Sequence, residues 1–261
     1  MRLLELRKPL VGMIHLLPVA GSARYDRRGP QPILDAALRD LAALERGGAD
    51  AVLVENFGDA PFAKAAPKET VAMMSVVLRS LVEAAAVPVG VNVLRNDGLA
   101  AMAIAAATGA SFVRVNVFAG VAFTDQGMVE GQARDLHALA RDLGTDVEIL
   151  ADVHVKHAAH LTQLEEAVID TERNRPHALV VTGVGTGYET SAEDLAAAKR
   201  TSHLPVFIGS GLCADNVAIY RDADGFIVGS ALKKGNSPDS RVDADRVAAL
   251  AAAIGSLRSH R

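Results

Sequence analysis

The chain has 261 residues, a mass of 27.3 kDa and a formal net charge of −4 at pH 7. This acidic balance, without any run of lysines or arginines, argues against nucleic acid as a partner. The lone cysteine, Cys213, excludes an internal disulfide and a multi-cysteine metal site, and we expect it to be a small buried residue rather than a nucleophile. No long apolar stretch follows the charged N-terminus, which predicts a cytoplasmic protein with no membrane insertion.

Apolar, β-branched runs alternate with alanine-rich amphipathic segments along the whole chain. The predicted strands are 10–16, 51–55, 89–94, 112–118, 147–154, 178–182, 206–210 and 225–230. The predicted helices are 33–46, 69–85, 99–107, 131–143, 161–173, 192–200, 216–220 and 244–257. Eight strands alternating with eight helices predict an α/β protein with a parallel sheet. No linker divides the chain, so we expect residues 1–261 to form a single (β/α)8 TIM barrel, with an open doubly wound sheet as the alternative.

The last two predicted strands both stop abruptly in Gly-Ser. In a barrel, glycines after strands 7 and 8 let backbone N–H groups approach a phosphate, and a short helix N-terminus adds its dipole. The doubled motif therefore predicts a phosphate site, although such glycines can simply end strands. Its residues are Gly209, Ser210, Gly211, Gly229 and Ser230.

Three predicted strands share one pattern, in which a single polar residue near the end of the strand is flanked by apolar residues. These polar residues are Asn92, Asn116 and Asp152. Because strand side chains alternate, these residues should face the same side of adjacent strands, at the barrel mouth. Gly90 is expected to leave room for Arg114, and Arg114 to share a buried charged network with Asp152.

The densest polar segment is 151–157. Alternation along an extended strand predicts that Asp152, His154 and Lys156 rise toward one mouth. Lys156 could act as a base or form a Schiff base, and Glu55 or Asp152 could shuttle protons with His154. No cofactor is firmly implied; a divalent metal held by Asp152 and His154 with Glu55 or His15 is an alternative. A purely structural alternative is an ion pair of Asp152 with Arg114 or Lys156.

Further residues at the predicted strand ends are candidates for binding substrate: His15, Asn92, Arg114, Asn116 and Thr182. Long loops at 18–31, 56–62, 120–127 and 183–188 are expected on the same face, where loops commonly bind substrate. The last of these does not match G-x-G-x-x-G, so a dinucleotide site is not favoured. Lys233 is expected either to neutralise a phosphate or to be solvated, and we favour the phosphate.

With these motifs the chain resembles the BtpA/SgcQ family over about residues 10–250. The matching pieces are Gly12-Met13-Ile14-His15-Leu16, Glu55-Asn56-Phe57-Gly58-Asp59, Asn92-Val93-Leu94-Arg95-Asn96-Asp97, Arg114-Val115-Asn116, Thr124-Asp125-Gln126-Gly127, Ala151-Asp152-Val153-His154-Val155-Lys156-His157, Val181-Thr182-Gly183, Gly209-Ser210-Gly211 and Ile227-Val228-Gly229-Ser230. The family usually has threonine at Ser230, so a hydroxyl is retained. The resemblance implies a phosphate-binding TIM barrel, grouped with phosphosugar and tryptophan-pathway enzymes.

Two functions compete at this point. The first is an isomerase, epimerase or lyase that acts on a phosphorylated small-molecule substrate. The second, implied by the family's link to photosystem I accumulation, is a non-catalytic assembly factor. Charged residues gathered at strand ends favour the enzyme, because a scaffold has no need of them. The alanine-rich outer helices are consistent with a homo-oligomer.

Overall fold

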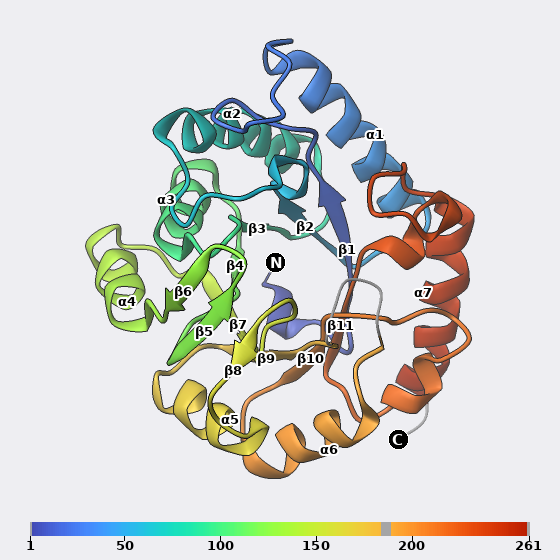
Figure 1. Ribbon diagram of the computed structural model, residues 1–261. Coiled ribbons are helices and arrows are strands. Elements are labelled where there is room, and N and C mark those ends of the chain that lie inside the picture. Colours follow the sequence, from blue (N-terminus) through green and yellow to red (C-terminus); the bar gives the residue numbers. More distant parts are fainter. Residues whose placement is uncertain (1, 184–188, 260–261) are drawn as a thin grey trace.

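The computed structural model describes residues 2–183 and 189–259. Its main sheet contains eight parallel strands: β1 (Leu10–His15), β2 (Ala51–Glu55), β3 (Val89–Asn92), β4 (Phe112–Val115), β7 (Glu148–Val153), β9 (Ala178–Val181), β10 (Val206–Ile208) and β11 (Gly225–Val228). They close into a barrel in the order β1-β11-β10-β9-β7-β4-β3-β2 (Figure 1). The predicted (β/α)8 barrel is thus confirmed, and the open sheet is wrong.

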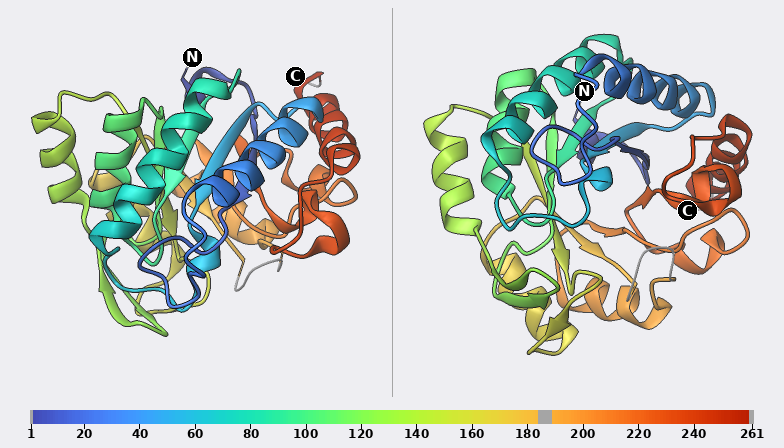
Figure 2. Two further views of the ribbon diagram at one scale, coloured as in Figure 1. Left: turned by 90° about the horizontal axis from the view of Figure 1, so that it is seen from above. Right: turned by 45° about the horizontal axis from the view of Figure 1, so that its top comes forward.

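Helices surround this barrel on its outer side (Figures 1 and 2). They are α1 (Gln31–Arg46), α2 (Lys68–Ala84), α3 (Gly98–Thr108), α4 (Ala133–Asp142), α5 (Leu164–Arg173), α6 (Ala192–Thr201) and α7 (Ala244–Ser259). The helix predicted at 216–220 is instead a 3-10 turn, η3 (Val217–Tyr220). Its two buried residues, Val217 and Tyr220, are three apart, and in a 3-10 turn such residues lie on one side.

The segment 120–127, expected to be a loop, contains a β-hairpin. Strands β5 (Val121–Thr124) and β6 (Gly127–Glu130) pair antiparallel, and β5 also pairs with the short β8 (Ala159–His160). Gly127 has φ +91°, which favours glycine in this tight turn. The hairpin was missed because only Ala122 and Val129 of its two strands are buried, so its apolar alternation is weak.

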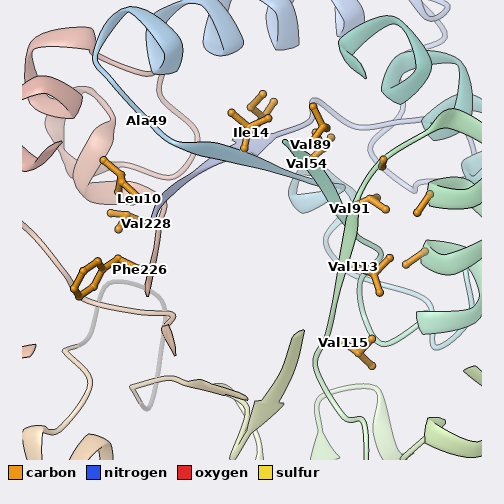
Figure 3. Packing of buried hydrophobic residues seen from close by; sticks show 14 of the residues in the cluster. Leu10, Ile14, Ala49, Val54, Val89, Val91, Val113, Val115, Phe226 and Val228 are labelled. Carbon is orange, nitrogen blue, oxygen red and sulfur yellow. The ribbon is translucent and has the colours of Figure 1, made fainter. Parts of the chain in front are cut away.

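Alternate residues of the barrel strands pack outward against the helices. Ile14, Val54, Val91, Val113 and Val228 belong to this cluster, and Figure 3 shows their side chains directed away from the barrel axis. Burying a complete aliphatic side chain of this kind contributes about 1.5–3 kcal/mol. This layer fixes the face that each strand turns inward.

The opposite residues of the same strands fill the barrel. The lower layers are apolar and include Met13, Leu53, Phe112, Val180 and Phe207. The N-terminal segment lies across this end, with Leu3 in the same cluster, near the centre of the view in Figure 1. Continuing the alternation upward on β1 and β2 leads from Met13 to His15 and from Leu53 to Glu55. Apolar layers therefore support a polar layer at the C-terminal ends of the strands.

Gly90 leaves space for a different side chain than expected. A Cβ atom at Gly90 would collide with the ring of Phe112, so this glycine makes room for Phe112 rather than Arg114. Arg114 is instead accommodated by Gly209, where a Cβ would lie 3.3 Å from the Arg114 Nη2. The phenylalanine fits one layer lower because the β3–β4 register pairs Gly90 with Phe112.

In the described part of the chain, no helix combines the length and apolar character needed to cross a membrane.

Candidate active site

A cavity of about 710 Å³ opens at the C-terminal ends of the barrel strands. Ten of the sequence-predicted site residues line it: His15, Glu55, Arg114, Asn116, Lys156, Gly209, Ser210, Gly211, Gly229 and Ser230. Asn92 and Asp152 lie behind this lining and contact it through hydrogen bonds. His154 and Thr182 lie elsewhere. The strand alternation thus gathers most of the predicted set in one place.

At the floor of the cavity, Arg114 and Asp152 form the expected buried ion pair. Nε of Arg114 donates to Oδ1 of Asp152 at 2.8 Å, and Nη2 donates to Oδ2 at 3.0 Å. The two side chains are 3% and 0% exposed. Nδ2 of Asn116 adds a third hydrogen bond to Oδ2 at 2.9 Å. The parallel bonds fix the guanidinium plane, which is the geometry that holds an arginine rigidly beside a ligand.

Glu55 is the buried carboxyl group beside this pair. Nδ2 of Asn92 donates to its Oε2 at 3.0 Å, as the β2–β3 register places the two residues side by side. Burial raises the pKa of Glu55, and the charges of Arg114 and Lys156 only partly oppose the shift. A carboxyl with a raised pKa exchanges protons closer to neutral pH.

His15 faces Glu55 in a fixed orientation. Its Nδ1 lies 2.9 Å from the carbonyl oxygen of Pro238, and its ring stacks on Phe57 with centroids 4.4 Å apart. Donation from Nδ1 leaves Nε2 unprotonated, and this atom lies 4.0 Å from Oε1 of Glu55. Burial, with the Lys233 charge, lowers the pKa of His15 to about 3, so the ring is neutral in ordinary buffers.

Lys233 is not solvated, and it does not line the cavity. It is 1% exposed, and its Nζ donates to the carbonyl oxygen of Pro238 at 2.7 Å. The same oxygen accepts from His15, so Lys233 supports the loop that orients that ring. Burial lowers the pKa of Lys233 to about 8. The expected role in neutralising a phosphate has no support in this position.

Lys156 reaches the cavity from the end of β7. Burial lowers the pKa of Lys156, and the Arg114 charge lowers it further against the opposing effects of Glu55 and Asp152. Its backbone carbonyl accepts a 2.8 Å hydrogen bond from Nη2 of Arg95. An amine with a lowered pKa and a carboxyl with a raised pKa therefore line the same cavity.

His154 does not face the mouth with Lys156, and this part of the sequence-based expectation is wrong. Strand β7 ends at Val153, and His154 has φ +51°, so the alternation breaks at that residue. Its ring stacks on His160 and lines a second cavity of about 180 Å³. Thr182 does not line the first cavity either. Its hydroxyl donates a 3.2 Å hydrogen bond to the backbone carbonyl of His154.

The ends of β10 and β11 form the opposite wall. Gly211 has φ +71°, and within the described residues neither its N–H group nor that of Gly229 donates to another backbone group. The short helix whose N-terminus was expected to add its dipole at this site is, after β11, only a three-residue 3-10 turn, η4 (Ser230–Leu232). Glu189 also lines this wall, with its Oε1 held by Asn216 Nδ2 at 2.9 Å. The wall offers chiefly backbone donors and small side chains.

Some lining residues were not in the predicted set. Phe57 and Arg95 come from the loops after β2 and β3, and Asp125 from the turn between β5 and β6. Their signals in the sequence were these positions and the family motifs that contain them. Cys213 also lines the cavity and is partly exposed, so the expected buried position is wrong. Of the loop expected at 183–188, residues 184–188 lie outside the described residues.

The metal ligands considered from the sequence are not brought together, because His154 lies away from Glu55 and His15. Among the residues that the structure describes, no group of three or more His, Cys, Asp or Glu side chains could hold a metal ion.

Comparison with protein families decides the relationship. The family model described as "BtpA family" matches residues 6–256. The chain belongs to the BtpA family. It is 47% identical over 254 residues to an uncharacterized protein of Thermococcus kodakarensis, covering 97% of each chain. It is 41% identical over 256 residues to the photosystem I biogenesis protein BtpA of Synechocystis, covering 96% of this chain and 89% of that one.

Solved structures show the same fold. Thiamine phosphate pyrophosphorylase from Pyrococcus furiosus matches with a TM-score of 0.60 at 17% identity, covering 96% of each chain. N-(5'-phosphoribosyl)anthranilate isomerase from the same organism matches with a TM-score of 0.60 at 14% identity, covering 95% of this chain and 99% of that one. This BtpA-family chain thus shares the TIM-barrel fold with these two enzymes. Its cytoplasmic location and homo-oligomeric state stay predictions.

Proposed function

We propose that this BtpA-family protein is an enzyme that acts on a small phosphorylated metabolite, with isomerase, epimerase or lyase chemistry. The observation that carries the proposal is that one cavity joins a wall of glycine backbone donors to a wall containing Glu55 and Lys156. A binding group and a proton-transfer group facing the same space are what such a reaction requires.

The substrate phosphate is assigned to the ends of β10 and β11. Gly209, Ser210, Gly211, Gly229 and Ser230 all line the cavity there. Backbone N–H groups without backbone acceptors can donate to phosphate oxygens, and the absent side chains let the phosphate come close. The names of the two structural neighbours refer to phosphorylated compounds, which supports the same assignment by analogy of fold.

Proton transfer is assigned to Lys156 and Glu55. The amine of Lys156, in its neutral form, takes a proton from the carbon next to a substrate carbonyl. Glu55, in its protonated form, gives a proton to the carbonyl oxygen, producing an enediol. Lys156 then gives its proton to the former carbonyl carbon, and Glu55 takes the proton of the other enediol hydroxyl. This completes an isomerisation, and both groups regain their first state. The opposite pKa shifts of the two groups favour this division of roles.

The remaining candidate residues bind or orient. Arg114, fixed by Asp152, presents its guanidinium to the cavity, and Asn116 lies beside it. His15 presents an unprotonated Nε2 that can accept a hydrogen bond from a substrate hydroxyl. Asn92 holds the Glu55 carboxyl in place.

Turnover of a panel of sugar phosphates by the wild type and by Lys156→Met tests the proposal. We expect Lys156→Met to keep the fold and phosphate affinity and to lose turnover. Lys64→Met, which removes a lysine outside the cavity lining, is the control and should retain activity. Borohydride trapping of the wild type with active substrates separates a Schiff base on Lys156 from simple acid–base chemistry.

The assembly-factor alternative has its own signature. It takes its support from the name of the Synechocystis relative. It predicts no turnover by the wild type on any phosphorylated compound and no effect of Lys156→Met on assembly. That combination would reject the enzymatic proposal.

A further inference from the structure

Two basic side chains in the active-site cavity have no carboxylate partner in the described part of the chain. Arg95, after β3, is 6% exposed, and Lys156 follows β7; both line the cavity. Within the described residues, no carboxylate oxygen lies within 4.0 Å of a side-chain nitrogen of either one. A buried arginine is normally paired, so Arg95 needs an explanation, whereas Lys156 is partly exposed.

The two residues are also tied together. Nη2 of Arg95 donates to the backbone carbonyl of Lys156 at 2.8 Å, and the Arg95 charge contributes to lowering the pKa of Lys156. The nearby guanidinium favours the neutral amine of Lys156, which leaves Arg95 as the buried cation that an anion can neutralise. The fixed backbone contact prevents the guanidinium from moving away to solvent.

Carboxylates near this wall are already engaged by other groups. Asp152 accepts two hydrogen bonds from Arg114, and Glu55 accepts one from Asn92. Asp125, on the hairpin turn, favours the charged form of Arg95, but it is exposed and accepts a hydrogen bond from the neighbouring Gln126. Among the described residues no carboxylate is left to pair directly with Arg95, so an anion from outside the protein can take that place.

This wall is separate from the glycine-rich ends of β10 and β11. In the closed barrel, β9 lies between β7 and β10 on one side, and β1 and β2 lie between β11 and β3 on the other (Figure 1). The cavity of about 710 Å³ connects the two walls. A ligand that uses both needs an anionic group at each end.

We propose that Arg95, beside the amine of Lys156, binds a second anionic group of the substrate, which is then a small molecule with a phosphate at one end and a carboxylate or second phosphate at the other. Arginine matches both groups, because its fork of N–H donors fits two oxygens of either one. The inference rests on the proposed function, since it assigns the first phosphate to the ends of β10 and β11.

Three six-carbon probes test this directly. Glucose 6-phosphate carries one anionic group, 6-phosphogluconate adds a carboxylate, and fructose 1,6-bisphosphate adds a second phosphate. Isothermal titration of the wild type should give a Kd about tenfold lower or better for one of the doubly anionic compounds than for glucose 6-phosphate. The tighter of the two identifies the second group. Equal affinity for all three would overturn the inference.

Variants separate the two ends of the ligand. Arg95→Gln should bind the doubly anionic probe no more tightly than glucose 6-phosphate. Its Kd for glucose 6-phosphate should stay within about twofold of the wild-type value. Gly229→Asp should weaken all three probes and keep their ratio. Arg134→Gln, which removes an arginine with a 92% exposed side chain, controls for net charge and should change nothing.

Arg95→Lys provides a second measurement if Arg95→Gln unfolds. This variant keeps the charge but not the guanidinium fork. It should therefore bind the doubly anionic probe only somewhat more tightly than glucose 6-phosphate, and this difference in Kd should disappear as the salt concentration rises. An advantage that is unchanged in folded Arg95→Gln, or in Arg95→Lys at any salt concentration, rejects the second anion site. Failure of all three probes to bind the wild type instead rejects the phosphate site of the proposed function.

Discussion

The buried pair of Arg114 and Asp152 leads to a stability prediction that does not depend on the substrate. Arg114→Met removes both charge-assisted bonds to Asp152 and leaves that carboxylate with Asn116 Nδ2 alone. Two hydrogen bonds to a charged group contribute about 1.5–3 kcal/mol each. Loss of one partner of a buried ion pair typically costs about 3–5 kcal/mol, and we expect a loss of unfolding free energy in that range.

Urea denaturation followed by far-ultraviolet circular dichroism measures this loss. With an m value of about 3 kcal/mol per molar urea, the midpoint should fall by roughly 1 to 1.7 M. Arg134→Met is the matched control, because Arg134 pairs with Asp135 on the surface, where the side chains are 92% and 62% exposed. That pair should contribute less than about 1 kcal/mol, so the control midpoint should scarcely move.

A double-mutant cycle tests the cause of the loss. If the cost arises from an unpaired buried charge, Arg114→Met combined with Asp152→Leu should cost clearly less than the sum of the two single changes. Additive losses would mean that the pair does not interact as its geometry indicates. An Arg114→Met protein as stable as the Arg134→Met control would refute the reasoning altogether.

The other predictions concern function and pH. Lys156→Met should abolish turnover, with kcat falling at least a hundredfold while circular dichroism and phosphate affinity are retained; an unchanged kcat contradicts the role of Lys156. Millimolar phosphate should raise the Tm of the wild type and of Gly229→Ala but not of Gly229→Asp. The alanine is tolerated because a Cβ at Gly229 lies at an ordinary 3.4 Å from His15. Equal shifts of Tm in all three proteins would show that no anion binds at the end of β11. His15 has a folded pKa of about 3, below the ordinary 6.5, so its contribution is present above pH 6.5 and is lost as the pH falls toward 3. His15→Gln should therefore lose less stability than the wild type between pH 6.5 and 3, by on the order of 4 kcal/mol, and parallel acid unfolding curves would show that His15 is not buried as described.

The choice of Gly229 rather than Gly209 as the test of anion binding follows from packing. A Cβ at Gly209 would lie 2.6 Å from Val180 Cγ1 and 3.1 Å from Thr182 Cγ2, inside the barrel wall. An aspartate there would disturb the barrel as well as repel a phosphate, so a lost response could not be assigned to the site. Sequence alone shows where a glycine stands but not what surrounds it.

The barrel and most of its polar layer could be predicted because both depend on local regularity. Strand residues alternate, so the inward position of Arg114, Asn116 and Asp152 follows from the period of β4 and β7. The identity of long-range neighbours does not follow from that period. Gly90 was assigned to Arg114 by size, whereas the register places it against Phe112 and leaves Arg114 to Gly209, from a distant strand.

The limit of the alternation is clearest at the end of β7. Asp152, His154 and Lys156 share one face only while the backbone stays extended, and His154 has φ +51° one residue after the strand ends. The turn carries the histidine to a second cavity, yet it returns Lys156 to the first, beside Arg95. Active-site residues of barrels commonly lie where strands give way to loops. The contact of Arg95 with Lys156 therefore depends on this turn, and the sequence, which places both residues after strands, could not show that they meet.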